Sequence, residues 1–390
     1  MKKIIYYTLL LFPLLATYGC DDLMWWKNDD DSLFPSASDN QPVPELSEDE
    51  ITVENIPSAV FTVNAENENI LNLNMTGIKS PDGDDFVILR GTGEDGQNVW
   101  LEIDNELIGF SVLNGSEIET KATSSVLAKA DLIFLVDNSG SMGDEADKVA
   151  EQIIQWSTEL AAVMDIQFAC VGYGEHYVEG AIDLTSVDNV SEYLNYSSGT
   201  SRTKHFSDNL SEEAIADAGN YYSYGECGVM ALDYALNHFS YRSGANRIYV
   251  NLTDEPNQAG TSNTQWSVEI FNDQSELYSW SPSSGTIHTV WSGGANYYSD
   301  SYSGWSAYTK EDPTLMSTYT GGTMVVDASS SYSNVNLSDL PVTGAILNSF
   351  EFGFDYTDNL KSGSHELKVT IDDDQTNVKL VNIIPIVISE

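Results

Sequence analysis

One short segment constrains the fold of this chain more than any other. Residues 132–136 form an unbroken apolar run, which is typical of a central parallel strand buried on both faces of a sheet. The run ends at Asp137, and Ser139 and Ser141 follow at alternate positions. Five apolar residues then recur at helical spacing: Val149, Ile153, Trp156, Leu160 and Val163. One carboxylate and two hydroxyls in a strand-to-helix turn are hard oxygen ligands, which suit Mg²⁺, Mn²⁺ or Ca²⁺ rather than zinc or copper.

This segment resembles the von Willebrand factor type A (vWA) family. Its Asp137-x-Ser139-x-Ser141 pattern matches the first part of the metal-ion-dependent adhesion site of that family. Asp254, directly after the predicted strand 247–252, matches the family's second aspartate, and residues 320–326 are similar to its last helix-to-strand turn. The resemblance implies a doubly wound, mostly parallel Rossmann-like α/β sheet with helices on both faces. It also implies a bound divalent cation, Mg²⁺ (or Ca²⁺ or Mn²⁺), whose open position is completed by an acidic group of a partner.

The middle ligand of the family is usually a Thr just before a helix, and this chain departs from that pattern. Counting back from the predicted helix 228–239 places Glu226 at that position, so the resemblance implies that Glu226 is a ligand. Ser223 is an alternative if the register is shifted. A further alternative is that Glu226 is only a first-turn acid, stabilised by the helix dipole.

Glu226 would change the charge of the site. Three carboxylates against a divalent cation sum to about −1 before any partner arrives, whereas two sum to about zero. We hypothesise that such a site either binds its cation more tightly and partner carboxylates more weakly, or uses a neutral or basic group of the partner.

Three loops that should meet at the same sheet edge are rich in Tyr, Ser and Gly. Ligands of open α/β sheets lie beyond the carboxyl ends of the strands, and this composition is typical of binding surfaces. The predicted ligand-contacting residues are Tyr173, His176, Tyr222, Tyr224, Tyr297, Tyr298, Tyr302 and Trp305. The alternative is that these are merely soluble Tyr-rich loops.

Short β runs flank the α/β segment on both sides. The predicted runs are 60–63, 70–75, 86–89, 99–103 and 108–113 before it, and 350–354, 365–371 and 378–388 after it. We therefore expect a β-rich domain over 58–127, a vWA domain over 128–338 and a β-rich segment over 339–390. Both flanks would build one β-sandwich with the α/β domain inserted in its loop. Two separate small β domains are the alternative.

The amino terminus has the pattern of an export signal. Residues 1–19 combine a basic start with a short apolar run, and Cys20 then resembles the lipidated Cys of bacterial lipoproteins, with a Bacteroidetes-like acidic pair after it. An ordinary secretory signal is the alternative. Residues 20–57 are predicted to be an acidic disordered tether. Cys170 and Cys227 could form a disulfide in an exported protein or remain two buried thiols.

The charge balance narrows the class of partner. The chain has 16 Lys and Arg against 60 Asp and Glu, a formal net charge of −44, which argues against nucleic acid and against an anionic membrane surface. The membrane would be contacted through the lipid anchor only. We expect an outer-membrane lipoprotein, surface-exposed or facing the periplasm, that binds a protein or glycan ligand. A subunit or scaffold of an envelope assembly, such as a fimbrial or secretion complex, is the alternative. No zinc-protease His pair or nucleophile–base motif is evident, so we do not expect an enzyme.

Overall fold

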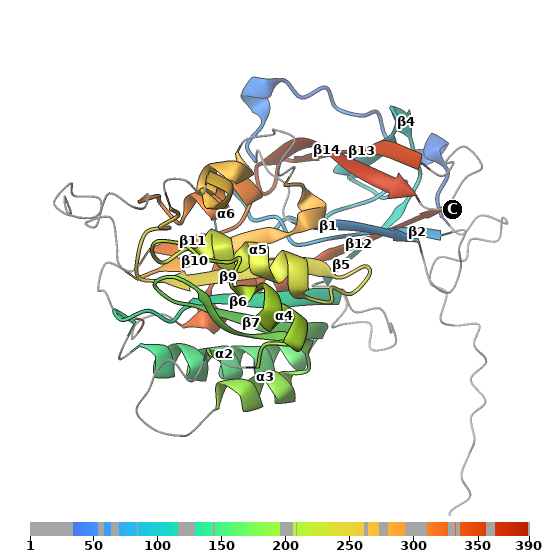
Figure 1. The fold of residues 1–390 in the computed structure, drawn as a ribbon. Helices are drawn as coiled ribbons and strands as arrows, with labels where there is room; N and C mark the ends of the chain where they lie inside the picture. The colour runs from blue at the N-terminus through green and yellow to red at the C-terminus, as the bar shows by residue number, and fades with distance from the viewer. Residues whose placement is uncertain are drawn as a thin grey trace, which may run out of the picture.

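The computed structural model describes most of the chain from Phe34 onwards. The described residues are 34–53, 58–63, 70–83, 85–115, 129–142, 145–195, 206–207, 209–260, 264–272, 280–292, 310–326, 332, 336–355 and 363–388. The expected signal peptide and Cys20 lie outside these residues. Within them, three sheets carry the fold: one mixed sheet covered by helices, and two antiparallel sheets beside it (Figure 1).

The six-stranded sheet has the order β11-β10-β9-β6-β7-β8. Its strands are β6 (Lys129–Asp137), β7 (Asp165–Tyr173), β8 (Val178–Thr185), β9 (Asn246–Thr253), β10 (Thr286–Trp291) and β11 (Met324–Val326). Neighbouring strands are parallel except for β8, which pairs antiparallel with β7. The apolar run in β6 is fully buried, as expected of a central strand. The predicted α/β class with a mostly parallel sheet is confirmed.

Helices cover both faces of this sheet (Figure 1). One face carries α2 (Ala146–Ala161) and α3 (Val187–Leu194), and the other carries α4 (Glu212–Ala218), α5 (Gly228–His238) and α6 (Leu315–Thr320). Trp156 of α2 packs edge-on against Phe134 of β6, with ring centroids 5.8 Å apart. Val163 was predicted to lie on the same apolar face, but it is 47% exposed because α2 ends at Ala161.

The two internal cysteines lie on opposite faces of the sheet. Cys170 of β7 belongs to the core under α2, whereas Cys227 belongs to the core under α5. Both are buried free thiols. The alternative of a disulfide between them is therefore wrong, because the sheet separates them.

The chain segments on either side of the α/β domain build one β-sandwich. One sheet has the order β1-β2-β12-β5 and the other β14-β13-β3-β4. The strands are β1 (Ala59–Val63), β2 (Ile70–Met75), β3 (Val99–Ile103), β4 (Glu106–Leu107), β5 (Ser111–Asn114), β12 (Phe350–Asp355), β13 (Gly363–Asp373) and β14 (Val378–Ile388). Their apolar side chains share a single core. The expected sandwich of amino- and carboxyl-terminal segments is confirmed.

One predicted strand is absent as such. Residues 86–89 contribute only an isolated bridge between Phe86 and Lys79. The backbone N–H of Leu89 donates to Oδ1 of Asn114, and Nδ2 of Asn114 donates to the Leu89 carbonyl. A single side chain therefore satisfies the backbone groups that a neighbouring strand would otherwise pair.

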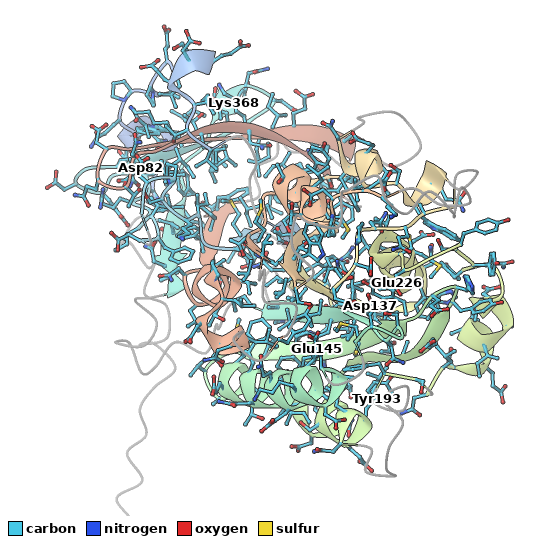
Figure 2. All side chains as sticks on the ribbon, turned by 90° about the vertical axis from the view of Figure 1, so that its left-hand side faces the viewer. Asp82, Asp137, Glu145, Tyr193, Glu226 and Lys368 are labelled. Carbon is cyan, nitrogen blue, oxygen red and sulfur yellow. The ribbon has the colours of Figure 1, made fainter. Side chains whose placement is uncertain are left out.

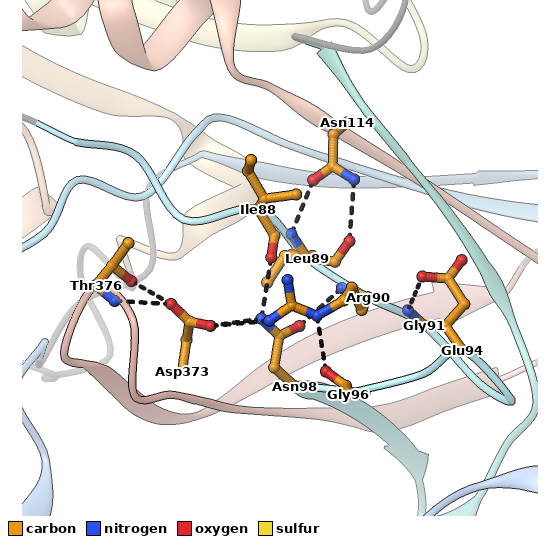
Figure 3. Close-up of polar contacts among 10 residues, drawn as sticks. All are labelled: Ile88, Leu89, Arg90, Gly91, Glu94, Gly96, Asn98, Asn114, Asp373 and Thr376. Atoms are coloured by element: carbon orange, nitrogen blue, oxygen red, sulfur yellow. Dashed lines mark hydrogen bonds and ion pairs between the residues drawn. The ribbon is translucent and has the colours of Figure 1, made fainter.

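A polar cluster around Asp373 ties the amino-terminal half of the sandwich to the β13–β14 hairpin (Figure 3). Asp373 is buried, and its carboxylate accepts hydrogen bonds from Asn98 Nδ2 at 2.9 Å and from the Thr376 N–H and hydroxyl at 2.9 and 2.6 Å. Arg90 lies 3.3 Å from the same carboxylate. Burial raises the pKa of Asp373, but the bonds from Thr376 and Asn98 and the charge of Arg90 outweigh it, so the pKa is lowered.

Part of the segment expected to be a tether lies against this sandwich. Phe34 is buried, and the indole N–H of Trp100 donates to the carbonyl of Gln41. Apolar burial and hydrogen bonding therefore hold residues 34–53 on the sandwich.

Short 3₁₀ turns lie at Ala37–Asp39, Glu48–Glu50, Thr264–Trp266, Val268–Phe271, Pro282–Ser284 and Leu337–Asp339. None of the helices in the described part of the chain is long and apolar enough to span a bilayer.

The α/β domain extends past residue 339, where the sequence predicted the β-rich segment to begin. Residues 341–347 form helix α7 (Pro341–Leu347), whose Val342 and Ile346 are buried in the α/β core. Close contacts also join the sandwich to the six-stranded sheet: the backbone N–H of Ser58 donates to the Thr286 hydroxyl at 2.5 Å. The α/β domain therefore packs against the sandwich and is hydrogen-bonded to it.

Candidate metal centre

The predicted ligands converge at the carboxyl-terminal edge of the six-stranded sheet. Asp137 ends β6, Glu226 lies just before α5, and Asp254 follows β9. One carboxylate oxygen from each of these three residues lies within 4.8 Å of the others. Figure 2 shows Asp137 and Glu226 side by side at this edge. Three segments that are far apart in sequence thus bring three acids to one point.

The two serines of the turn join this cluster. The backbone N–H of Ser139 donates to Oδ1 of Asp137 at 2.9 Å, and the hydroxyls of Ser139 and Ser141 are 3.1 Å apart. The Ser141 hydroxyl donates to Oδ1 of Asp254 at 3.1 Å. All five residues predicted as ligands therefore lie together, and the bond from the Ser139 N–H to the Asp137 side chain shapes the turn that carries the two serines.

The electrostatics of the cluster call for a positive partner. Burial, followed by the charge of Asp254, raises the pKa of Asp137. Burial, followed by the charges of Asp137, Glu255 and Asp254, raises the pKa of Glu226. Both shifts have the same cause: enclosed carboxylates repel one another and lack water. A proton or a cation must neutralise them.

The donor set fits a hard divalent cation. It offers carboxylate and hydroxyl oxygens only, which are the ligands that Mg²⁺, Ca²⁺ and Mn²⁺ prefer. Glu226 is 9% exposed, and its carboxylate interacts with the side chain of Ser139. Its second oxygen, Oε2, is buried and has no hydrogen-bond partner among the described residues. A buried carboxylate oxygen without a partner is costly, and a cation between the three acids would remove that cost.

The segment after β9 holds Glu226 in place. The backbone N–H of Gln258 donates to the Glu226 carbonyl at 2.7 Å, and the Glu226 N–H lies 3.3 Å from Oε1 of Gln258. Ser223, the alternative ligand, is buried, and its hydroxyl donates to the Gln258 carbonyl at 2.7 Å. A Cβ at Gly225 would lie 2.8 Å from the Cβ of Gln258, closer than two such atoms pack, so glycine allows this close approach of the two segments. Ser223 thus anchors the loop, and Glu226 is the residue that reaches the cluster.

The structure places the predicted ligand-contacting residues in different environments. Tyr173 is buried at 1% exposure, and its hydroxyl donates to Asn251, so its assignment as a ligand contact is wrong. It is the last residue of β7 and packs into the core instead of leaving the sheet. His176, Tyr222 and Tyr224 lie together at the metal edge. The remaining four predicted contacts lie outside the described residues: Tyr297, Tyr298, Tyr302 and Trp305.

Several supporting residues have no motif that would reveal them. The Thr253 hydroxyl donates to Oδ2 of Asp137 at 3.0 Å, and Asn138 donates from Nδ2 to Glu179 at 2.5 Å. The Tyr332 hydroxyl lies 3.0 and 2.9 Å from the carbonyls of Thr253 and Val290. The adjacency of Thr253 to Asp254 and the place of Asn138 between Asp137 and Ser139 were the available signals for this set, because the contacts themselves depend on tertiary packing.

Comparisons with known proteins give distant likenesses only. No protein-family model matches the chain, and no curated protein matches it. Among solved structures, the open conformation of the pilus adhesin SpaC from Lactobacillus rhamnosus GG aligns with 11% identity and a TM-score of 0.31, over 84% of this chain and 48% of its own. Proximal thread matrix protein 1 from the mussel byssus aligns with 13% identity and a TM-score of 0.28, over 52% and 45%.

The vWF domain of the type V pili tip protein Mfa5 from Porphyromonas gingivalis aligns with 10% identity and a TM-score of 0.20, over 38% of this chain and 50% of its own. This chain thus spans about half the length of the structures named here. Likeness this distant establishes neither a family nor a function for the chain.

Proposed function

We propose that this chain is a vWA-type binding protein of the bacterial envelope, which holds a protein or glycan ligand through a divalent cation at the edge of its sheet. Asp137, Ser139, Ser141, Glu226 and Asp254 would hold the cation, Mg²⁺ in the first instance. A bound cation would supply a coordination position for an oxygen of the ligand. The role is binding rather than catalysis.

One observation carries this proposal. Five oxygen-bearing side chains from three separate loops meet at one point, and the buried Oε2 of Glu226 lacks a partner there. A capped helix start would explain one of these residues but not the convergence of all five. The edge also lies beyond the carboxyl ends of parallel strands, where open α/β sheets bind their ligands.

The location of the protein belongs to the same proposal. The pattern of residues 1–20 is that of a lipoprotein signal, so we propose an outer-membrane anchor at Cys20 with the metal edge exposed on the cell surface. Residues 20–33, the rest of the segment predicted to be a tether, lie outside the described residues.

A pull-down tests the proposal. The full chain is immobilised and exposed to bacterial envelope extract and, separately, to host matrix extract, each with Mg²⁺ or with EDTA. We expect partners that are retained in Mg²⁺, released by EDTA and lost with Asp254→Asn. Envelope partners would indicate a subunit of an envelope assembly, and matrix partners an adhesin. Identical protein sets in Mg²⁺, in EDTA and with the variant would overturn the proposal.

A further inference from the structure

Four aromatic rings form a continuous surface beside the metal centre. We call His176, Tyr177, Tyr222 and Tyr224 the tyrosine surface. Tyr222 is its centre: it stacks on His176 at a centroid distance of 5.7 Å and touches Tyr177 at 5.2 Å and Tyr224 at 5.5 Å. The rings come from two connections, the turn between β7 and β8 and the loop between α4 and α5.

The rings at the ends of the surface face solvent. Tyr177 is 51% exposed and Tyr224 is 41% exposed. Both rings nevertheless pack against Tyr222, so the faces that remain open are held in fixed positions. Large exposed aromatic groups that adjoin one another are uncommon on a protein surface and mark binding sites.

Hydrogen bonds connect this surface to the metal centre. The backbone N–H of Ser223 donates to the His176 carbonyl at 3.0 Å, and Tyr177 and Tyr222 form an isolated antiparallel bridge. Asn138, between two of the proposed ligands, donates to Glu179 of β8. Tyr224 precedes Glu226 by only two residues. The tyrosine surface and the cation site are therefore connected parts of one edge of the sheet.

The charge at this edge would stay negative with a divalent cation bound and all three clustered acids ionised. The three clustered acids carry −3 when ionised, which exceeds the +2 of a divalent cation. Other described carboxylates lie on the same connections: Glu175 beside His176, Glu179 paired with Asn138, and Glu255 beside Asp254. The described residues place one basic side chain at this edge, that of Lys310, whose positive charge partly offsets the rise in the pKa of Glu255. A partner carboxylate would meet net repulsion here, whereas a cationic group would be attracted.

We propose that the tyrosine surface binds an arginine side chain on a basic segment of a partner protein. The biological role of this contact rests on the proposed function, of which it names the partner class. A guanidinium stacks on aromatic faces and also pairs with carboxylates, so it uses both features of this edge. A neutral glycan would use the rings but would gain nothing from the excess negative charge.

Peptide titrations test the inference. The full chain in Mg²⁺ at 150 mM salt is titrated with an acetylated Gly-Arg-Gly-Arg-Gly amide, with the same peptide carrying citrulline, and with the same peptide carrying Glu. Citrulline keeps the planar shape of Arg without its charge. We expect the Arg peptide to bind at least about tenfold more tightly than the citrulline peptide, and the Glu peptide to show the weakest binding.

Variants separate the rings from general attraction to an acidic protein. Tyr177→Leu combined with Tyr222→Leu leaves the net charge unchanged, and we expect it to weaken Arg peptide binding about tenfold. Tyr319→Leu is the matched control, because Tyr319 also has a carboxylate neighbour, Glu269, but lies on α6 outside the tyrosine surface. We expect this control to bind the Arg peptide as the unmodified chain does. Thermal unfolding of each variant checks that it is folded.

The results that would overturn the inference differ from those that would overturn the proposed function. Equal binding of the Arg and citrulline peptides, or an unchanged affinity in the folded double variant, would refute the arginine site. Tight, EDTA-sensitive binding of the Glu peptide would refute it as well, while supporting the proposed cation-dependent function. Displacement of the Arg peptide by a neutral oligosaccharide such as cellohexaose would also overturn the inference, because it would show that these rings bind a glycan.

Discussion

The hydroxyl of Ser141 donates to Oδ1 of Asp254 at 3.1 Å, although 113 positions separate the two residues in sequence. This bond joins the turn after β6 to the turn after β9, two strands that are hydrogen-bonded neighbours in the sheet. Each residue thereby limits the orientation of the other. The proposed ligands are thus positioned by the fold itself before any cation binds, which favours tight binding because little ordering remains to be done.

Replacing Asp254 by Asn should abolish the stabilisation that a cation gives. A cation that binds only the folded state adds about 2.7 kcal/mol at one hundred times its dissociation constant. We expect Mg²⁺ to raise the melting temperature of the unmodified chain but not that of Asp254→Asn. Without metal, the variant should melt about 2 °C higher, because one of three crowded acids has been removed. Differential scanning calorimetry with Mg²⁺ and with EDTA measures both effects.

The exposed Glu151 provides the matched control for that experiment. It lies on α2, away from the cluster, and pairs only loosely with Lys148 at 3.4 Å. Glu151→Gln removes the same amount of charge, so we expect it to keep the full response to Mg²⁺. An equal response of Asp254→Asn and Glu151→Gln to Mg²⁺ would show that Asp254 does not hold the cation.

Replacing Glu226 by Thr should weaken the binding of the cation and strengthen the binding of acidic groups to the site. The variant loses a carboxylate, and we expect its Mg²⁺ dissociation constant to rise by roughly tenfold or more. At saturating Mg²⁺, its site charge is near zero, so the Glu peptide described above should bind more tightly than it binds the unmodified chain. Isothermal titration calorimetry measures both constants. Unchanged or weaker binding of the Glu peptide would contradict the effect attributed to Glu226.

Replacing Asp373 by Ala should destabilise the sandwich without affecting the metal centre. The change leaves Asn98 and Arg90 without the buried carboxylate that they share (Figure 3), at an expected cost of about 2–3 kcal/mol in the free energy of unfolding. The neighbouring Asp374 has a side chain that is 95% exposed, and Asp374→Ala should cost less than about 0.5 kcal/mol. Urea unfolding compares the two. Equal costs would mean that the polar cluster does not stabilise the fold.

The sequence predicts the strands and the site best where local pattern and burial agree. The apolar run of β6 is buried on both faces, as its pattern predicts, and the end of this strand and the turn after it carry three of the proposed ligands. The short runs predicted at 70–75 and 99–103 are likewise observed with those bounds, as β2 and β3. The position of Glu226 follows from counting along α5, whose register its buried residues fix.

Failures occur where a tertiary contact replaces a local one. Leu89 lies in a run with the composition of a strand, but the side chain of Asn114 forms the hydrogen bonds of its backbone N–H and carbonyl groups. Tyr173 looks like a loop aromatic, yet it is the last residue of β7, and Asn251 binds its hydroxyl in the core. Neither partner lies nearby in sequence, so no periodicity or spacing could have revealed these contacts.

His288 should make the stability of the α/β domain depend on pH. It is buried in β10, where its Nδ1 accepts a hydrogen bond from the backbone N–H of Thr323 at 3.0 Å. Burial lowers the pKa of His288 to about 3. In the unfolded chain the ring takes up a proton below about pH 6.5. Between these two values the unfolded state binds more protons, so the free energy of unfolding falls as the pH is lowered.

The variant His288→Gln should lack this contribution, because its side chain does not titrate. We expect it to be less stable than the unmodified chain at pH 7.5, where the ring is neutral in both states. At pH 5.0 that difference should shrink by about 2 kcal/mol, since each unit below pH 6.5 costs the unmodified chain about 1.4 kcal/mol. Urea unfolding of both proteins at the two pH values gives this change directly, because contributions of the other titrating groups cancel in the difference. A difference that is the same at pH 7.5 and pH 5.0 would show that His288 takes up its proton equally in the folded and unfolded states.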